Sequence, residues 1–469
     1  MALLESRKAL TREKRNGAIS HYHGTLASIL EDSSGKELQS RVRTLTQSSP
    51  GEIIYALQAV SGIHDAVVII HGALGCAASG VWFNSGENRS WYTTNLNESD
   101  TILGGDEKLR AAILRAYNEN HPEAIFIIGT PIIAINNDDV DSVVIELSDE
   151  LGCKIIYIDV NGFKTKNALS GYDVIFHGFL KHLVEPKQNP VKPFLNLFTV
   201  SESPDNVAAI VELLQVLDIP CNIVPRFSGL NGIRRASGAL CSVSLDDAEN
   251  EYIMTGLEEQ YGVPVVKTNP PIGTAGVYDF IKKIAAHFDR NAQAETLIKD
   301  EEQKISGRRS KKPFAGKKIL LEADLHRVVS FSSLIEELGG EISGIVIPHL
   351  DIQNAGKLKD LSILPRTVPF IVAQGQQFEI ANVLNRYPAD FYIGRSETAA
   401  AAARFGAIPL PLDGITYYGY RGIGEVVKRA LKLGTNNNYV SLLGQKLGAP
   451  YSESWLKRSG NWYVKFEVK

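Results

Sequence analysis

From about residue 50 the chain alternates short, β-branched apolar runs with amphipathic helical segments. Strands are predicted over residues 66–70, 124–128, 154–160 and 174–177, with helices over 107–118 and 141–151. Strands that are apolar on both faces and separated by helices are typical of a parallel sheet covered on both sides. The first part of the chain is therefore predicted to be an α/β domain.

The same alternation starts again twice further along the chain. The second set has predicted strands at 194–200, 221–225 and 263–266, and the third has them at 317–322, 341–347, 369–372, 390–393 and 408–410. The charged segment 300–312 has no strand character and is interpreted as part of a linker. We therefore predict an N-terminal arm (1–45), three α/β domains (46–192, 193–299 and 316–434), a linker (300–315) before the third, and a C-terminal tail (435–469). The tail carries Trp455, Trp462, Tyr463 and Phe466, and it is either a docking segment or a small satellite core.

Composition narrows the class of protein. The 469 residues are 44% hydrophobic and 22% charged, which is enough apolar material for more than one core. The net charge of -4 gives no basic excess for nucleic acid or an anionic membrane. The apolar runs 66–70 and 124–128 are much shorter than the roughly 20 residues of a membrane span, and the N-terminus lacks the apolar stretch of a secretory signal. We expect a cytoplasmic protein with no nucleic-acid or membrane partner.

The loop after the first predicted strand is the strongest candidate for a functional site. It reads His71-Gly72-Ala73-Leu74-Gly75-Cys76, and open α/β sheets place their ligands beyond the carboxyl ends of the strands. Its small residues allow another molecule to approach the backbone. A cysteine at the start of a turn or helix is favoured as a thiolate, which is the form that binds iron or zinc. The alternative is that Cys76 is a small buried filler.

The other three cysteines give no local metal motif. Cys153, Cys221 and Cys241 are far apart along the chain and no CxxC pair occurs, so neither a self-contained zinc site nor a disulfide framework is expected. Cys153 and Cys221 lie at the start of predicted strands and are interpreted as small buried side chains. The sequence has no GxxxxGK[ST] phosphate loop and no GxGxxG fingerprint, so this chain is not expected to hydrolyse ATP or to use NAD.

Several short motifs, in the same order along the chain, resemble those of the nitrogenase component 1 superfamily. They are HGxxGC at 71–76, the polar segment 94–98, GGxxxL at 104–109, and the segments 137–140, 271–273 and 419–422. The resemblance implies three doubly wound parallel-sheet (Rossmann-like) domains around a central cleft. It also implies a homologous α-type partner subunit, a further pairing to α2β2, and a separate ATP-dependent iron protein that delivers electrons.

The resemblance further implies an iron-sulfur cluster at the subunit interface, with Cys76 as a ligand and His71, Gly72 and Gly75 in the cofactor-binding loop. Two other cysteine positions of the family fall at 47–50 and 130–131, where this sequence has no thiol. An ordinary four-iron cluster takes about four thiolates. We therefore expect a [4Fe–4S] cluster with three cysteines from the partner, in preference to an eight-iron cluster. This arrangement is similar to that of the family's cofactor-assembly scaffold.

Cys241 is a second candidate for a metal ligand. The α-type subunits of the family bind a large iron-sulfur cofactor through a cysteine in the second domain and a histidine in the third. Cys241 lies near the first of these positions, but the segment before Gly419 reads PLPLDGITYY, which has no histidine and resembles the β-type pattern. The large cofactor is therefore expected in the partner subunit.

Three functions remain open. The first is an electron-relay β-type subunit of a nitrogenase-like reductase, such as those acting on methylthio-alkanes or tetrapyrroles, with the reductive site in the partner. The second is a scaffold subunit for nitrogenase cofactor assembly. The third is a non-enzymatic module that binds a small ligand. The sequence names no substrate and no catalytic residue.

Overall fold

The computed structural model describes residues 21–32, 41–43, 51–83, 91–163, 167–187, 192–350, 354–373, 377–435, 437–449, 451–458 and 464–466. These residues divide into two compact units, each assembled from separate stretches of the chain. Of the described residues, unit 1 contains those within 51–201 and 220–267, and unit 2 contains those within 21–43, 202–219 and 268–466. None of the described helices has both the length and the apolarity that a bilayer span needs.

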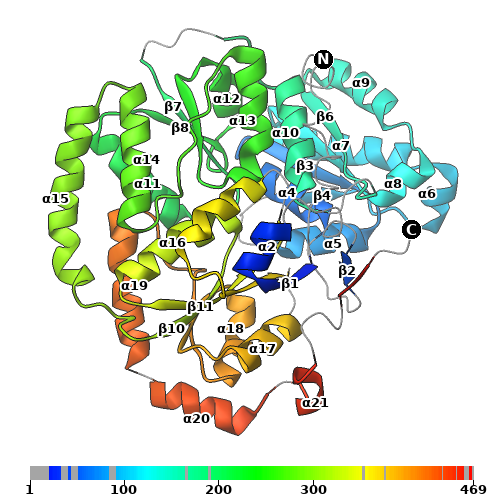
Figure 1. The fold of residues 1–469 in the computed structure, drawn as a ribbon. Helices are drawn as coiled ribbons and strands as arrows, with labels where there is room; N and C mark the ends of the chain where they lie inside the picture. The colour runs from blue at the N-terminus through cyan, green and yellow to red at the C-terminus, as the bar shows by residue number, and fades with distance from the viewer. Residues whose placement is uncertain are drawn as a thin grey trace. The chain divides into compact units, whose positions relative to one another are not determined.

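The larger sheet of unit 1, of which β3, β4 and β6 are labelled in Figure 1, is parallel and has the strand order β4-β3-β5-β6. Its strands are β3 (Ala66–His71), β4 (Trp91–Thr93), β5 (Ala124–Gly129) and β6 (Lys154–Asp159). The chain passes from β3 to β4 on one side and then to β5 on the other side of β3. The carboxyl ends of β3 and β5 therefore flank a topological switch point, the place where open α/β sheets bind ligands.

Alternate residues of these strands pack on opposite faces of the sheet. One face, with Ile70, Phe126 and Ile158, packs with α4 (Glu52–Ser61) and α10 (Ser170–His182). The other face, with Ile69, Ile127 and Ile155, packs with α7 (Asp106–Asn120) and α9 (Val140–Leu151). Both faces are buried, which explains why the strands are apolar throughout and confirms the predicted parallel α/β fold.

The remaining helices of unit 1 are short, apart from α13. They are α5 (Leu74–Phe83), α6 (Glu98–Leu103), α8 (Pro131–Asn136), α12 (Leu230–Arg234), the 3-10 helix η2 (Arg235–Gly238) and α13 (Asp247–Tyr261). Of these, α5, α6 and α8 follow the carboxyl ends of β3, β4 and β5. They therefore lie at the ligand-binding edge of the larger sheet.

A second parallel sheet in unit 1 has the order β8-β7-β9, with β7 (Leu195–Thr199), β8 (Cys221–Pro225) and β9 (Cys241–Ser244). A row of buried polar side chains crosses it in register, from Asn222 through Asn196 to Ser242. Asn222 Nδ2 donates to Asn196 Oδ1 at 3.0 Å, and Asn196 Nδ2 lies 3.3 Å from Ser242 Oγ. Because a register slip would leave these groups unsatisfied, the row fixes the strand register.

Unit 2 contains a six-stranded sheet with the order β1-β12-β11-β10-β13-β14. The strands are β1 (His21–Thr25), β10 (Lys318–Glu322), β11 (Glu341–Ile347), β12 (Pro369–Ala373), β13 (Phe391–Gly394) and β14 (Ile408–Pro411). All neighbours are parallel except β1, which adds antiparallel to β12 at the edge. Part of the predicted N-terminal arm is therefore an edge strand. A separate ribbon pairs β2 (Arg41–Arg43) with β15 (Val464–Phe466).

Besides its strands, unit 2 contains α-helices and the 3-10 helix η3. They are α2 (Leu26–Asp32), α11 (Pro204–Val216), α14 (Gly273–His287), α15 (Asn291–Arg309), α16 (Leu325–Glu337), η3 (Asn354–Ile363), α17 (Gln377–Arg386), α18 (Ser396–Arg404), α19 (Gly419–Gly434), α20 (Asn437–Leu447) and α21 (Glu453–Leu456). The segment 300–315, expected to be a linker, is helical as far as Arg309 because it completes α15. In the tail, the described Trp455 contacts Phe378 of α17.

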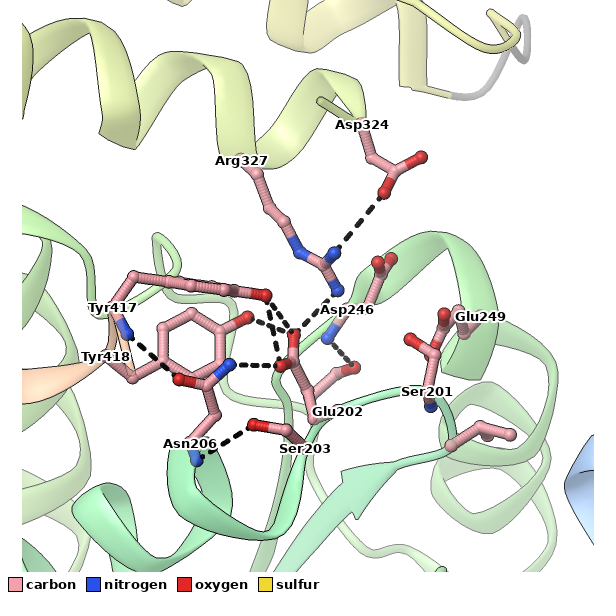
Figure 2. Close-up of polar contacts among 12 residues, drawn as sticks. Ser201, Glu202, Ser203, Asn206, Asp246, Glu249, Asp324, Arg327, Tyr417 and Tyr418 are labelled. Carbon is pink, nitrogen blue, oxygen red and sulfur yellow. Dashed lines mark hydrogen bonds and ion pairs between the residues drawn. The ribbon is translucent and has the colours of Figure 1, made fainter. Parts of the chain in front are cut away.

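A buried carboxylate joins sequence-distant parts of unit 2 (Figure 2). Glu202 is 2% exposed, and it accepts hydrogen bonds from Arg327 Nη2 at 2.6 Å and Tyr418 Oη at 2.7 Å. Asn206 Nδ2 donates to it at 2.9 Å, and the Tyr417 hydroxyl lies 3.2 Å away. A buried charge is tolerated when it has such partners. The cluster therefore holds the start of α11, the first turn of α16 and the loop before α19 together.

Two strand predictions are wrong. Residues 174–177 lie inside α10, where Tyr172, Ile175, Phe176 and Phe179 are buried at helical spacing. A short apolar run does not by itself distinguish a buried helix from a strand. Residues 263–266 form no strand, and Val265 makes only an isolated bridge to Ser242. The strand beside β7 is β9, which was not predicted because its buried Ser242 and Ser244 break the apolar pattern.

Candidate functional site

Cys76 lies at the switch point of the larger sheet in unit 1, where the loop leaves the carboxyl end of β3. It is the third residue of α5, and its backbone N–H donates to the Ala73 carbonyl at 3.1 Å. The residue is half-buried and forms no disulfide. Its neighbour Gly75 is exposed, and the Leu74 side chain is 55% exposed. The loop therefore presents this cysteine close to the surface of the described chain.

The two glycines of the loop have different environments. A Cβ on Gly72 would lie 2.0 Å from Thr130 Oγ1, so the chain itself requires glycine there. Thr130 is held in place because its N–H and its hydroxyl both donate to the His71 carbonyl, at 3.1 and 3.0 Å. A Cβ on Gly75 would meet nothing within 4 Å. Gly75 is thus open to an approaching molecule, whereas Gly72 serves internal packing.

The described part of the chain supplies one thiol at this place. Thr130, at one of the family positions for another cysteine, is buried and packed against Gly72. The other position, 47–50, lies outside the described residues. Within the described ranges, no three or more His, Cys, Asp or Glu side chains are arranged to hold a metal ion. A metal cluster at Cys76 would therefore need ligands from elsewhere.

His71 lies beneath the loop and is fully buried. Its Nδ1 is 3.0 Å from Thr94 Oγ1, and its Nε2 is 3.8 Å from Asp138 Oδ2. Burial lowers the pKa of His71 to about 4, so the ring is neutral near pH 7. Burial also raises the pKa of Asp138, assisted by the charge of Asp106 and opposed by a hydrogen bond from the Gly105 N–H.

Three motifs that carried the sequence resemblance meet around His71. Thr94, from the polar segment 94–98, accepts the Gly72 N–H at 2.9 Å. Gly105, from the GGxxxL motif, is packed so closely that its Cβ would lie 2.9 Å from both His71 Cε1 and Asp138 Oδ2. Asp138 belongs to the third motif, in which Asn137 ends α8 with a left-handed φ of 56°. These motifs therefore build one continuous structure behind the Cys76 loop.

Next to this structure, α6 exposes two large apolar side chains. None of its residues is buried, and Ile102 and Leu103 are 83% and 85% exposed. The helix is fixed by polar contacts instead, with a capping box between Asn97 and Asp100 and an ion pair of 2.6 Å from Lys108 to Asp100. It contacts α8, where Ile135 is 66% exposed (Figure 1). Exposed apolar groups gathered on a fixed surface are typical of an interaction site.

The two motifs of the later sequence meet in unit 2 and serve packing. The Gly419 N–H donates to the Pro271 carbonyl at 2.8 Å. A Cβ on Gly422 would lie 2.2 Å from the Tyr417 carbonyl carbon, so α19 can begin there only with glycine. Neither contact presents a group to a ligand.

The other cysteines lie in less favourable places for a metal. Cys241 is fully buried in β9, and burial raises the pKa of its thiol to about 12, which disfavours the thiolate. A ligand role for Cys241 stays a prediction that its surroundings do not support. Burial also raises the thiol pKa of Cys153, which is buried, and of Cys221, which is half-buried.

The chain belongs to the family of nitrogenase component 1 type oxidoreductases, whose model matches residues 53–433. The family resemblance found in the sequence motifs is thereby confirmed. This chain is 25% identical over 386 residues to the nitrogenase iron-molybdenum cofactor biosynthesis protein NifE of Methanococcus maripaludis, and the match covers 77% of this chain and 78% of that protein. It is 28% identical over 311 residues to the nitrogenase molybdenum-iron protein alpha chain of Methanosarcina barkeri, covering 62% and 58% of the two chains. The solved structure of nitrogenase Cp1 at pH 5 matches with a TM-score of 0.72 at 19% identity, covering 92% of this chain and all of the other, and this supports the fold.

Proposed function

We propose that this chain is a subunit of a nitrogenase-like complex in which Cys76 binds an iron-sulfur cluster shared with a homologous partner subunit. The observation that carries the proposal is the placement of Cys76 at a switch point, beside the exposed Gly75 and Leu74. The described residues around Cys76 offer no second thiol, because Thr130, which packs against Gly72, occupies the position where the family has another cysteine. One thiolate from this chain and three from the partner would complete a four-iron cluster.

The shared cluster would supply one-electron transfer when bound. In the complex we propose, an ATP-dependent iron protein delivers electrons and the partner holds the reductive site and the large cofactor. The exposed Ile102 and Leu103 of α6 are the surface on which we expect this electron donor to dock, since α6 lies at the same sheet edge as Cys76. The β-type assignment rests on the segment before Gly419, and the α2β2 assembly rests on the family resemblance.

A scaffold role in cofactor assembly is the second candidate. It is favoured by the similarity to NifE proteins, including that of Klebsiella pneumoniae, which is 26% identical over 403 residues and covers 78% of this chain and 85% of that protein. A scaffold would hold the same interface cluster but would carry a cofactor precursor and perform little turnover.

The proposal is tested by expressing this chain with its partner and measuring iron and acid-labile sulfide in the purified pair and in the chain alone. A shared cluster predicts iron and sulfide in the pair and neither in the isolated chain. Iron that the isolated chain retains, or a pair without iron, would contradict it. Assay of the loaded pair with its iron protein then separates the roles, because a reductase consumes reductant continuously and a scaffold does not.

A further inference from the structure

We propose that Thr94, His71 and Asp138 form a buried polar chain that positions the Cys76 loop, and that His71 is a positioning residue and not a ligand. The identity of the group held by the loop rests on the proposed function, whereas the positioning role does not. His71 is fully buried and points at Thr94 and Asp138, so its ring nitrogens are already directed inward.

The hydrogen-bond geometry indicates which atoms donate and which accept in the contacts among Thr94, His71 and Asp138. Thr94 Oγ1 accepts the Gly72 N–H at 2.9 Å, and its single hydroxyl hydrogen can go to His71 Nδ1 at 3.0 Å or to the Gly72 carbonyl at 3.4 Å. If it goes to the carbonyl, Nδ1 must carry the ring hydrogen, and the lone pair of Nε2 then faces the carboxylate of Asp138. If it goes to Nδ1, the Nε2–H points toward that carboxylate, which is electrostatically favourable. Asp138 thus selects the Nε2–H tautomer.

Asp138 accepts a hydrogen bond from the Gly105 N–H, and its Oδ2 faces His71 Nε2. The side chains of His71 and Asp138 are 0% and 3% exposed, and His71 Nε2 and Asp138 Oδ2 have no hydrogen-bond partner among the described residues. Gly105 closes the space around both atoms, since a Cβ there would lie 2.9 Å from each side chain. Buried polar atoms without partners cost free energy. Among the described residues, the favourable charge-to-dipole interaction across 3.8 Å is therefore the one available to these two atoms.

The polar contacts around Thr94 hold the backbone of Gly72 in place. Its N–H is held by Thr94, and its carbonyl accepts the Leu96 N–H at 2.9 Å. Thr130 packs against its Cα. Since Cys76 follows four residues later, the position of its sulfur depends on this anchored peptide.

The test measures the rate at which the Cys76 thiol reacts with 4,4′-dithiodipyridine in the full chain without any cluster, resolved by mass spectrometry of its peptide. The half-buried Cys221 in the same molecules is the internal reference. We expect Thr94→Val to raise the Cys76 rate about tenfold, as the loss of about one buried hydrogen bond implies. Thr94→Ser keeps the hydroxyl and is expected to stay within about twofold of wild type.

Two substitutions of His71, to Asn and to Gln, provide a second test in the same assay. Asn places a polar atom where Nδ1 lies and keeps the contact with Thr94, whereas Gln places one near Nε2 and loses it. His71→Gln is expected to behave like Thr94→Val. His71→Asn keeps the contact with Thr94 but loses the one with Asp138, and it is expected to raise the Cys76 rate less than His71→Gln. If the thiols of Cys76 and Cys221 both react faster, the whole fold has been loosened and the proposal is overturned. Unchanged Cys76 reaction rates in folded Thr94→Val and His71→Gln would also overturn it. Because no cluster is present in this assay, the result is independent of whether the purified pair contains iron.

Discussion

Gly72 lies in the loop after β3, and Gly75 lies three residues later in the first turn of α5. Both positions hold glycine, but for different physical reasons. Gly72 is required by Thr130, which stands where its Cβ would be, whereas the space beside Gly75 is empty. The HGxxGC pattern drew attention to both positions without separating them. Only the contacts distinguish a glycine needed for folding from one available to an incoming group.

Substitution of these glycines should therefore have separate effects. Gly72→Ala is expected to lower the free energy of unfolding by about 2 kcal/mol, since overpacking forces Thr130 to move. Gly75→Ala should leave it unchanged or raise it by up to about 1 kcal/mol, because alanine favours the helix in which residue 75 lies. In the purified pair, however, Gly75→Ala should reduce cluster content if the partner or cluster approaches there. Chemical denaturation and iron analysis measure the two effects, and normal iron content in Gly75→Ala would argue against close approach at that position.

His71 makes the free energy of unfolding depend on pH. Its pKa is near 4 in the folded chain, below the usual 6.5, so between these values the unfolded chain binds a proton that the folded chain does not. This contribution is complete above pH 6.5 and is lost as the pH falls toward 4, amounting to about 3 kcal/mol. His71→Asn should remove it and give a flatter stability profile over this interval in urea denaturation. The raised pKa of Asp138 changes the free energy of unfolding in the opposite direction as the pH falls, and it is present in both wild type and His71→Asn. Equal slopes for the two proteins would show that His71 does not titrate as described.

At the scale of elements, the strands were predictable and several of their neighbours were not. The strands β3, β5 and β6 are apolar on both faces, so their runs stand out in the sequence. The apolar run at 174–177 looked the same but lies in α10, and β9 was hidden by its buried serines. The Cys76 loop could be found from its motif. The roles of Thr94 and Asp138 could not, because they depend on contacts with His71 from 23 and 67 positions along the chain.

The short helix α6 is an element whose apolar residues serve no internal packing, since none of its residues is buried. Replacing Ile102 and Leu103 together by serine should leave the fold and the cluster absorbance intact. It should weaken docking of the proposed iron-protein partner about tenfold, because truncating an apolar anchor typically costs more than about 1 kcal/mol of binding free energy. Ile145→Ser on α9 is the matched control, with an isoleucine that is 65% exposed on another helix of the same unit. Titration of the reduction rate against iron protein concentration measures the effect, and equal affinities for all three proteins would exclude α6 as the docking surface.

At the scale of the whole molecule, two compact units are each built from distant stretches of one chain. Unit 2 depends on groups such as Glu202 to join these stretches (Figure 2). Glu202→Ala would leave Arg327, whose side chain is 14% exposed, without its 2.6 Å partner, so we expect the free energy of unfolding to fall by about 4 kcal/mol. Glu202→Gln, which keeps an acceptor, should cost less.

Glu212→Ala provides the comparison for this prediction. Glu212 lies in α11, the helix that begins two residues after Glu202, and pairs with Arg421 at 3.3 Å, but both side chains are more than half exposed. Such a surface pair contributes about 0–1 kcal/mol. The melting temperatures of the three variants should therefore fall in the order Glu212→Ala, Glu202→Gln, Glu202→Ala, from highest to lowest. Similar values for the two alanine variants would mean that Glu202 does not hold unit 2 together.

In the proposed complex, the Cys76 sulfur completes an iron-sulfur cluster together with thiols from another subunit. The most direct measurement is the iron content and visible charge-transfer absorbance of the co-purified pair, compared between wild type, Cys76→Ala and the control Cys221→Ala. We predict that Cys76→Ala loses the shared cluster while this chain stays folded, and that Cys221→Ala keeps it. Full iron content and unchanged absorbance in a folded Cys76→Ala pair would contradict the account.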